Sequence, residues 1–173
     1  MARTSAGILL YRRREGVIEV LLVHPGGPFF GRKDLGNWSI PKGEVDEDDL
    51  DFEQTARREF LEEVGHPVPP GRLIDLGSIR QKSGKTVYAW AVEGDIDPAT
   101  MTSNMIPIPW PPFTIPEIDK WVYYGPEQAR LHMKETQLPL LDRLYAALWA
   151  IPAPDEAGPP DEDGPPDAAA GAS

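Results

Sequence analysis

The chain has no cysteine, which excludes disulfide bonds and thiolate metal sites. It also has no long uninterrupted apolar run, so we expect no membrane-spanning helix and no membrane partner. The apolar run near the N-terminus, GILL, is too short for a secretory signal. These absences favour a cytoplasmic protein.

Basic residues are also scarce, with 17 Lys and Arg against 28 Asp and Glu and a net charge of −11. The acidity is uneven, because residues 152–173 hold six acidic side chains and no basic one; removing those six leaves −5 for the rest. A segment of proline, alanine and acid buries too little apolar surface to fold. We therefore predict one domain over 1–151 and a disordered tail over 152–173, with no DNA or RNA duplex as partner.

The 173 residues suffice for one domain with a hydrophobic core. Hydrophobic periodicity and turn residues predict a mixture of strands and helices. The expected strands cover 6–12, 17–24, 38–40, 73–81, 86–92 and 120–124, and the expected helices cover 52–64, the segment after Pro126, and 138–150. Residues 94–116 are rich in proline and are expected to form a loop. This order favours an α/β protein whose mixed sheet is covered on both faces.

The segment RREFLEEVG, residues 57–65, carries three glutamates within five positions: Glu59, Glu62 and Glu63. At about 100° per residue, a helix places these glutamates on one face and Phe60, Leu61 and Val64 on the opposite, inward face. A solvated acidic face tolerates such repulsion, at about 0.2–0.5 kcal/mol per pair. The alternative is a site for a hard divalent cation, Mg²⁺ or also Mn²⁺, which prefers oxygen ligands and completes its shell with substrate phosphates.

The residues around these glutamates resemble the Nudix box, the signature of the Nudix hydrolase family. The matching positions are Pro41, Lys42, Gly43, Arg58, Glu59, Phe60, Glu62, Glu63 and Gly65. The sequence departs from the box in three ways. The span from Gly43 to Arg58 is one position longer than usual, Asp48 or Asp49 is the nearest match to the first glutamate of the box, and His66 replaces an apolar residue.

This resemblance implies a Nudix-type α/β/α sandwich and a hydrolase that splits a nucleoside diphosphate linked to a group X. It implies that Glu59, Glu62 and Glu63 bind Mg²⁺, that the backbone carbonyl of Lys42 adds a ligand, and that Arg58 orients a glutamate. One of these glutamates, or a glutamate from a loop, serves as the general base. Glu117, just before a late strand, matches the family's additional loop acid; the alternative is an ordinary solvated carboxylate.

The sequence also contains candidates for substrate binding. Five basic residues expected in loops are phosphate-binding candidates or else surface charges: Arg32, Lys33, Lys42, Lys82 and Lys85. Trp110 and Phe113, in a proline-rich loop, either stack on a base or cap an edge of the core.

Pro41-Lys42-Gly43 resembles the variant found in diadenosine polyphosphate and diphosphoinositol phosphate hydrolases. A dinucleoside polyphosphate or a nucleoside triphosphate is the expected substrate. The alternatives are a diphosphoinositol polyphosphate, ADP-ribose, or nucleotide binding without catalysis. The protein is expected to be a monomer or a homodimer.

Overall fold

The computed structural model describes residues 3–29, 34–109 and 112–150. The predicted tail, 152–173, lies outside the described residues, as do Arg32, Lys33 and Trp110. Within the described ranges, none of the helices combines the length and the apolar character needed to cross a membrane.

A six-stranded mixed sheet forms the centre of the molecule, in the order β4-β5-β1-β2-β8, with β3 paired to β1 outside this path. Its strands are β1 (Thr4–Arg14), β2 (Val17–Pro25), β3 (Lys42–Glu44), β4 (Ile74–Arg80), β5 (Thr86–Glu93) and β8 (Ile118–Tyr124). The pairing of β1 with β5 is parallel, and the other pairings are antiparallel. The first strand therefore contacts three others and organises the sheet.

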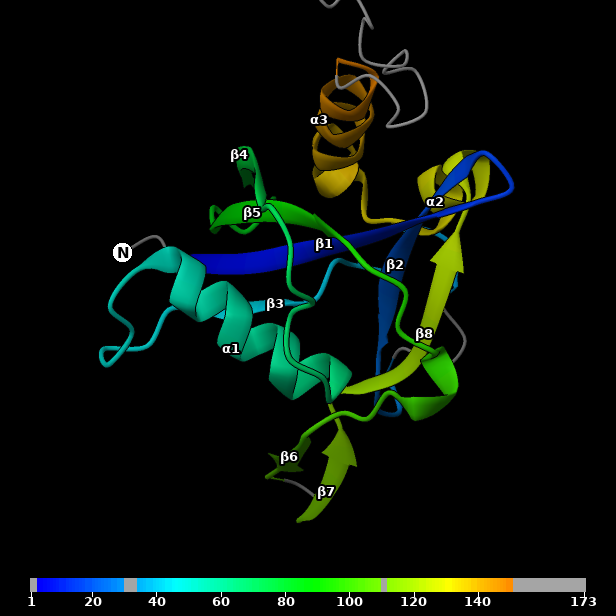
Figure 1. The fold of residues 1–173 in the computed structure, drawn as a ribbon. Coiled ribbons are helices and arrows are strands. Elements are labelled where there is room, and N and C mark those ends of the chain that lie inside the picture. Colours follow the sequence, from blue (N-terminus) through cyan, green and yellow to red (C-terminus); the bar gives the residue numbers. More distant parts are fainter. Residues whose placement is uncertain (1–2, 30–33, 110–111, 151–173) are drawn as a thin grey trace, which may run out of the picture.

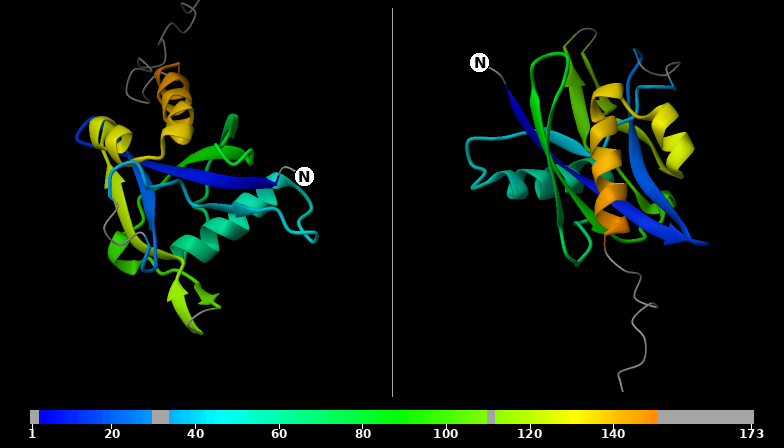
Figure 2. Two further views of the ribbon diagram at one scale, coloured as in Figure 1. Left: turned by 180° about the vertical axis from the view of Figure 1, so that it is seen from behind. Right: turned by 90° about the horizontal axis from the view of Figure 1, so that it is seen from above.

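Helices cover both faces of this sheet (Figures 1 and 2). The helix α1 (Phe52–Val64) lies on one face, and α2 (Pro126–His132) and α3 (Leu138–Trp149) lie on the other. Side chains of β1 alternate between two hydrophobic cores: Ile8 and Leu10 pack with α1, and Leu9 and Tyr11 pack with α3. The predicted α/β/α sandwich with a mixed sheet is confirmed.

The boundaries of α1 follow from its terminal residues. The side chain of Asp51 accepts a hydrogen bond from Gln54 N at 2.7 Å and caps the first turn. Gly65 ends the helix in the left-handed conformation, with φ of 79°, and donates its N–H to Leu61 O. A Cβ at Gly65 would lie 2.2 Å from Thr102 Oγ1, so the loop after α1 also requires glycine.

One expectation about the strands is wrong. Residues 38–40 form only isolated bridges, and the strand β3 begins after Pro41. This strand is held by its antiparallel partner, because Ser5 pairs with Glu44 and Gly7 with Lys42.

The segment 94–116 is not a structureless loop. It contains the short 3₁₀ helix η1 (Pro98–Thr100) and a hairpin of β6 (Met105–Ile108) and β7 (Phe113–Pro116). The hairpin lies apart from the main sheet at the lower end of Figure 1.

Candidate active site

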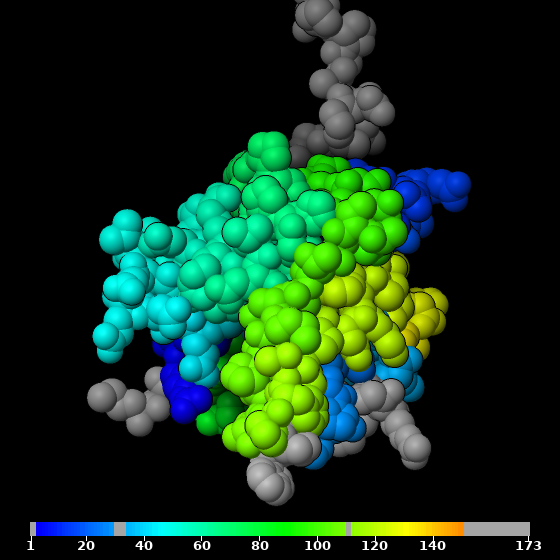
Figure 3. Space-filling model, turned by 90° about the horizontal axis from the view of Figure 1, so that it is seen from below, coloured from blue at the N-terminus to red at the C-terminus, as the bar shows by residue number. Residues whose placement is uncertain are grey.

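The candidate site lies where α1, β3 and the residue preceding β8 meet. A small pocket of about 120 Å³ opens there, and its lining includes Lys42, Glu63, Glu117 and Lys134. Seen from below, the molecule is hollowed between the cyan residues around β3 and the yellow-green β6–β7 segment (Figure 3). Elements far apart in the sequence therefore contribute to one concave surface.

Gly43 allows β3 to approach the carboxylate of Glu59. A Cβ built on Gly43 would lie 2.0 Å from the carboxyl carbon of Glu59, which is a severe overlap. Next to it, the backbone N–H of Lys42 donates to Glu63 Oε2 at 3.1 Å. The strand β3 thus contacts two of the three helix glutamates through its main chain.

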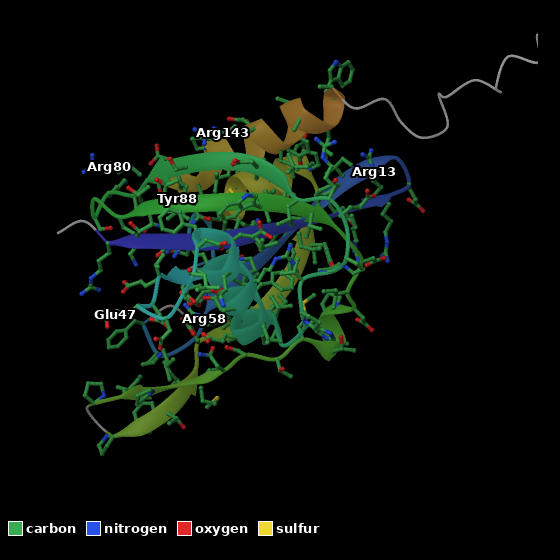
Figure 4. The ribbon with its side chains drawn as sticks, turned by 60° about the vertical axis from the view of Figure 1, so that its left-hand side comes forward. Arg13, Glu47, Arg58, Arg80, Tyr88 and Arg143 are labelled. Carbon is green, nitrogen blue, oxygen red and sulfur yellow. The ribbon has the colours of Figure 1, made fainter. Side chains whose placement is uncertain are left out.

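Arg58 is the centre of an ion-pair network that includes one of the two aspartates nearest to the first acid of the box. Its Nε and Nη2 donate to Asp49 Oδ1 and Oδ2 at 3.2 and 2.9 Å, a bidentate pair. Nη1 donates to Glu59 at 2.8 Å and to Glu62 at 3.3 Å. Asp49 is mostly buried, whereas Asp48 is exposed, so Asp49 is the one of the two that contacts the site. Figure 4 shows Arg58 on α1, on the same side of the molecule as Glu47 in the acidic loop.

The helix glutamates do not share a solvent face as expected. Glu59 and Glu63 are only 7% and 5% exposed, whereas Leu61, expected on the inward face, is 50% exposed. The inward arc of α1 includes both carboxylates because β3 approaches the helix there. Phe60 and Val64 are fully buried, as expected. Two carboxylates withdrawn from solvent fit a site better than they fit a solvated acidic face.

Burial perturbs both carboxylates. Desolvation, followed by the charge of Glu62, raises the pKa of Glu59 to about 7. Desolvation, followed by the charge of Glu117, raises the pKa of Glu63 well above its ordinary value. Glu117 lines the same small pocket as Glu63. Electrostatically, this cluster favours a bound cation.

The donor set fits a hard divalent cation, although the side chains are not arranged around one. Among the residues that the structure describes, no three acidic or histidine side chains converge as a cation site. Arg58 instead pairs with Glu59 and Glu62, and Lys42 N with Glu63. Carboxylate oxygens that repel one another are nevertheless the ligands that Mg²⁺ prefers. Arg58 contacts Oε1 of each of these two glutamates, so binding of a cation through their Oε2 atoms is compatible with these hydrogen bonds.

The lysines near the carboxylates differ from those expected. Lys134 lines the same pocket as Lys42. It was not predicted from the sequence, because residues 134–136 match no motif and lie far from the box. Burial lowers the pKa of Lys42, and the Lys134 ammonium lowers it further. Lys85 forms an ion pair with Glu44 at 2.9 Å. Lys82 lies 3.7 Å from Glu135, and both side chains are exposed.

The remaining substrate-binding candidates are not brought together. Phe113, on β7, is 43% exposed and belongs to the described lining of neither the small pocket nor the larger one beside it. Arg32, Lys33 and Trp110 lie outside the described residues. Their roles stay predictions.

Known proteins share both the sequence pattern and the fold. No curated protein sequence matches the chain. The sequence model of the NUDIX domain matches residues 1–148. The fold is similar to the NUDIX domain of Shewanella oneidensis NrtR, solved in complex with ADP ribose, at 18% identity, a TM-score of 0.63, and coverage of 86% of this chain and 89% of that chain.

Two further solved structures share the fold. One is a binary complex of a C. elegans Ap4A hydrolase, at 23% identity, a TM-score of 0.62, and coverage of 87% of this chain and 100% of that chain. The other is RenU, a Nudix hydrolase from M. smegmatis, at 19% identity, a TM-score of 0.56, and coverage of 88% and 90%. With the family model matched over 148 residues and the three glutamates of the box present, the chain belongs to the Nudix family and is a pyrophosphohydrolase.

Proposed function

We propose that the protein is a Mg²⁺-dependent hydrolase that cleaves the pyrophosphate bond of a nucleoside diphosphate linked to X. The observation that carries this proposal is the burial of the Glu59 and Glu63 carboxylates beside Glu117 and the main chain of β3. A buried cluster of acids is costly unless a cation neutralises it. Phosphates of the substrate complete the coordination shell of such a cation.

Each residue of the site has a distinct part in this proposal. Glu59, Glu62, Glu63 and Glu117, with the backbone carbonyl of Lys42, hold the cation. When bound, Mg²⁺ neutralises phosphate charge and activates water. Arg58, fixed by Asp49, orients Glu59 and Glu62 through charge-assisted hydrogen bonds. A glutamate that is not saturated by the cation accepts the proton of the attacking water.

A dinucleoside polyphosphate such as diadenosine tetraphosphate is the first candidate substrate, followed by a nucleoside triphosphate. The Pro41-Lys42-Gly43 variant and the half-buried lysines of the small pocket support a substrate with a long phosphate chain. The solved relatives add two ligands to test, because one is an Ap4A hydrolase and another was solved with ADP ribose. The proposed setting is the cytoplasm, with the protein as a monomer or a homodimer.

The test is turnover of a defined panel with Mg²⁺ and with EDTA: diadenosine tetraphosphate, ATP, dGTP, ADP-ribose and a diphosphoinositol phosphate. We expect Mg²⁺-dependent release of phosphorylated products from at least one compound. Glu63→Gln is expected to lower kcat at least ~100-fold, because ligand and acid–base roles contribute about 10²–10⁴. Glu53→Gln, on the same helix and paired only with Arg57 among the described residues, is the matched control.

Two results would contradict the proposal. Wild-type kcat in purified, folded Glu63→Gln would show that this glutamate has no role in catalysis. Tight nucleotide binding without turnover of any panel compound would instead identify a non-catalytic binding module.

A further inference from the structure

The C-terminal turn of α1 is bound by residues that lie far away in the sequence. A helix ends with carbonyl groups that have no partner within the helix. In α1, the carbonyl of Glu62 accepts a hydrogen bond from Asn104 N at 2.9 Å. The carbonyl of Glu63 accepts one from the indole Nε1 of Trp121, on β8, at 2.7 Å. The backbone that carries these two glutamates is therefore held by hydrogen bonds from outside the helix.

The segment that contains Asn104 also binds the backbone around Glu117. Glu117 donates its N–H to Asn104 O at 3.1 Å. The next N–H, that of Ile118, donates to Ser103 Oγ at 2.9 Å, and this hydroxyl in turn donates to Asn104 O at 2.9 Å. The backbone of Asn104 therefore links the two elements that carry the acidic side chains, because its N–H binds α1 and its carbonyl binds the residue before β8.

Glu117 is also held from the side of β2. Its carbonyl accepts a hydrogen bond from Gly26 N at 2.8 Å, and a Cβ at Gly26 would lie 2.1 Å from Pro116 O, so this approach requires glycine. Figure 1 shows the β6–β7 hairpin, which lies between Asn104 and Glu117 in the sequence, next to the end of α1 and the start of β8. Of the hydrogen bonds around Glu117, the one to Ser103 involves a side chain and can be removed by substitution.

The relative position of these carboxylates matters for a hard cation. Mg²⁺ requires near-ideal octahedral geometry, with oxygen ligands at about 2.0–2.1 Å. Groups that hold metal ligands in place contribute about 10–100-fold to metal affinity. Glu63 and Glu117 line the same small pocket, and Trp121 and Ser103 hold their backbones. Loss of either hydrogen bond would change the separation of the two carboxylates without removing a ligand.

We propose that Ser103 and Trp121 are positioning residues of the cation site, and that Ser103 acts through Glu117 and Trp121 through Glu63. This inference rests on the cation site of the proposed function. It adds two residues whose side chains bind backbone groups next to the ligands instead of the cation itself. Neither is a catalytic residue.

The test measures equilibrium binding of Mn²⁺ by titration calorimetry without nucleotide, so it does not depend on turnover. Ser103→Ala removes the hydroxyl, and Ser103→Thr retains it. Trp121→Phe removes the indole N–H and retains an aromatic ring. The control, Thr100→Val, removes a hydroxyl from the same part of the chain that contacts Asp97 O and His66, outside the site. Urea unfolding measures the stability of each variant.

We expect Ser103→Ala and Trp121→Phe each to weaken Mn²⁺ binding about tenfold. Ser103→Thr and Thr100→Val should bind Mn²⁺ as the wild type does. A merely structural role of Ser103 predicts a loss of stability with unchanged Mn²⁺ affinity, and this result would overturn the inference. Ser103→Ala removes one partly buried hydroxyl, so it keeps the inference testable if Trp121→Phe does not fold.

A double variant shows through which glutamate each residue acts. Because Ser103 acts through Glu117, Ser103→Ala should have no further effect on Mn²⁺ binding in the Glu117→Gln background. Trp121→Phe should still weaken binding in that background. Additive effects of Ser103→Ala and Glu117→Gln would overturn the assignment of Ser103 to Glu117.

The outcomes separate this inference from the proposed function. If the wild type binds Mn²⁺ and hydrolyses a panel compound, but Ser103→Ala and Trp121→Phe bind Mn²⁺ equally well, the inference fails and the proposed function stands. If the variants show the expected losses but the wild type hydrolyses no panel compound, the proposed function fails and the inference stands. Absence of Mn²⁺ binding by the wild type would overturn the inference.

Discussion

At the scale of single residues, the site depends on close contacts that leave no room for other side chains. Gly43 contacts the carboxylate of Glu59, and Asp49 holds Arg58 with two hydrogen bonds. Neither contact could be predicted from the sequence, because glycine and aspartate occur at many positions for other reasons. The contacts form only when β3 and the acidic loop pack against α1.

Gly43→Ala is expected to disable the enzyme with little loss of stability. The added Cβ overlaps the end of a flexible side chain, so the Glu59 carboxylate moves and the fold adapts. Displacing a catalytic group by about 1 Å costs on the order of 100-fold in rate. We expect kcat to fall about 100-fold and the free energy of unfolding to change by less than about 1 kcal/mol. Steady-state kinetics and urea unfolding measure the two effects.

Gly125→Ala is the matched control for this substitution. A Cβ at Gly125 meets only Val17 Cγ1 at 3.9 Å, an ordinary contact, so activity should be retained. Wild-type kcat in Gly43→Ala would contradict the importance of the contact between β3 and Glu59.

Asp49→Asn tests which aspartate serves as the first acid of the box. We expect it to destabilise the fold by about 1–2 kcal/mol, because a charged hydrogen-bond partner of partly exposed Arg58 is lost. Turnover should also fall, since Arg58 no longer orients Glu59 and Glu62. Asp48→Asn changes an exposed side chain and should remain within about 0.5 kcal/mol of the wild type. Equal effects of the two substitutions in urea unfolding would contradict the assignment.

Asp49 is also expected to cause part of the loss of stability at low pH. The hydrogen bonds from Arg58 hold the pKa of Asp49 below its ordinary value, so the folded state binds this proton less readily than the unfolded state. Its contribution to stability is complete above the unfolded pKa of about 3.9 and is lost as the pH falls below it. Thermal unfolding between pH 7 and pH 3 should show a shallower acid loss in Asp49→Asn than in the wild type.

At the scale of elements, α1 could be predicted to the residue, because its signals are local. Asp51 caps the first turn, Gly65 ends the helix, and the apolar residues between them repeat with helical period. The strand β3 and the β6–β7 hairpin could not be predicted. Lys42–Glu44 has no strand pattern and is held by β1, and the hairpin contains Pro107 and Pro116, which indicate a loop when taken by themselves.

The same contrast applies to the site. Arg58, the three glutamates and Glu117 could be named from the sequence, whereas Lys134 could not, because only the packing of Trp38 against the segment after α2 brings it to Glu63. The burial of Glu59 and Glu63 could not be predicted from the sequence either. It follows from the approach of β3 and not from the helical period.

Asp51→Ala tests the cap of α1. Loss of the hydrogen bond to Gln54 N should cost about 1 kcal/mol in the free energy of unfolding. Asp51→Asn keeps a capping oxygen and should restore most of the loss. Urea unfolding measures both variants, and equal stability of Asp51→Ala and the wild type would show that the cap contributes nothing.

At the scale of the whole molecule, the two hydrophobic cores and the sheet between them stabilise the fold, whereas the acidic site destabilises it. Glu59, Glu63 and Glu117 repel one another between α1 and β8. A cation that binds only the folded state stabilises it by mass action. The free energy of unfolding of the entire domain should therefore increase when a cation occupies the site.

Mg²⁺ is accordingly expected to raise the melting temperature, and EDTA to reverse the change. At 100 times the dissociation constant the gain is about 2.7 kcal/mol, which corresponds to about 5–11 °C at ~2–4 °C per kcal/mol. Differential scanning calorimetry at constant ionic strength measures it. The double variant Glu59→Gln/Glu63→Gln should lose most of the shift, and an equal shift in that variant would place the cation elsewhere.

The pairing of β1 with β5, and of β2 with β8, has a consequence for biogenesis. Thr4 pairs with Thr86 and Val20 with Tyr124, so the first strands to leave the ribosome wait for partners synthesised much later. Loops of this length close slowly, and topologies dominated by distant pairings fold in milliseconds to seconds. Until Tyr124 has emerged, nascent β2 exposes an unpaired edge, and this interval is when a chaperone would be most useful to the chain.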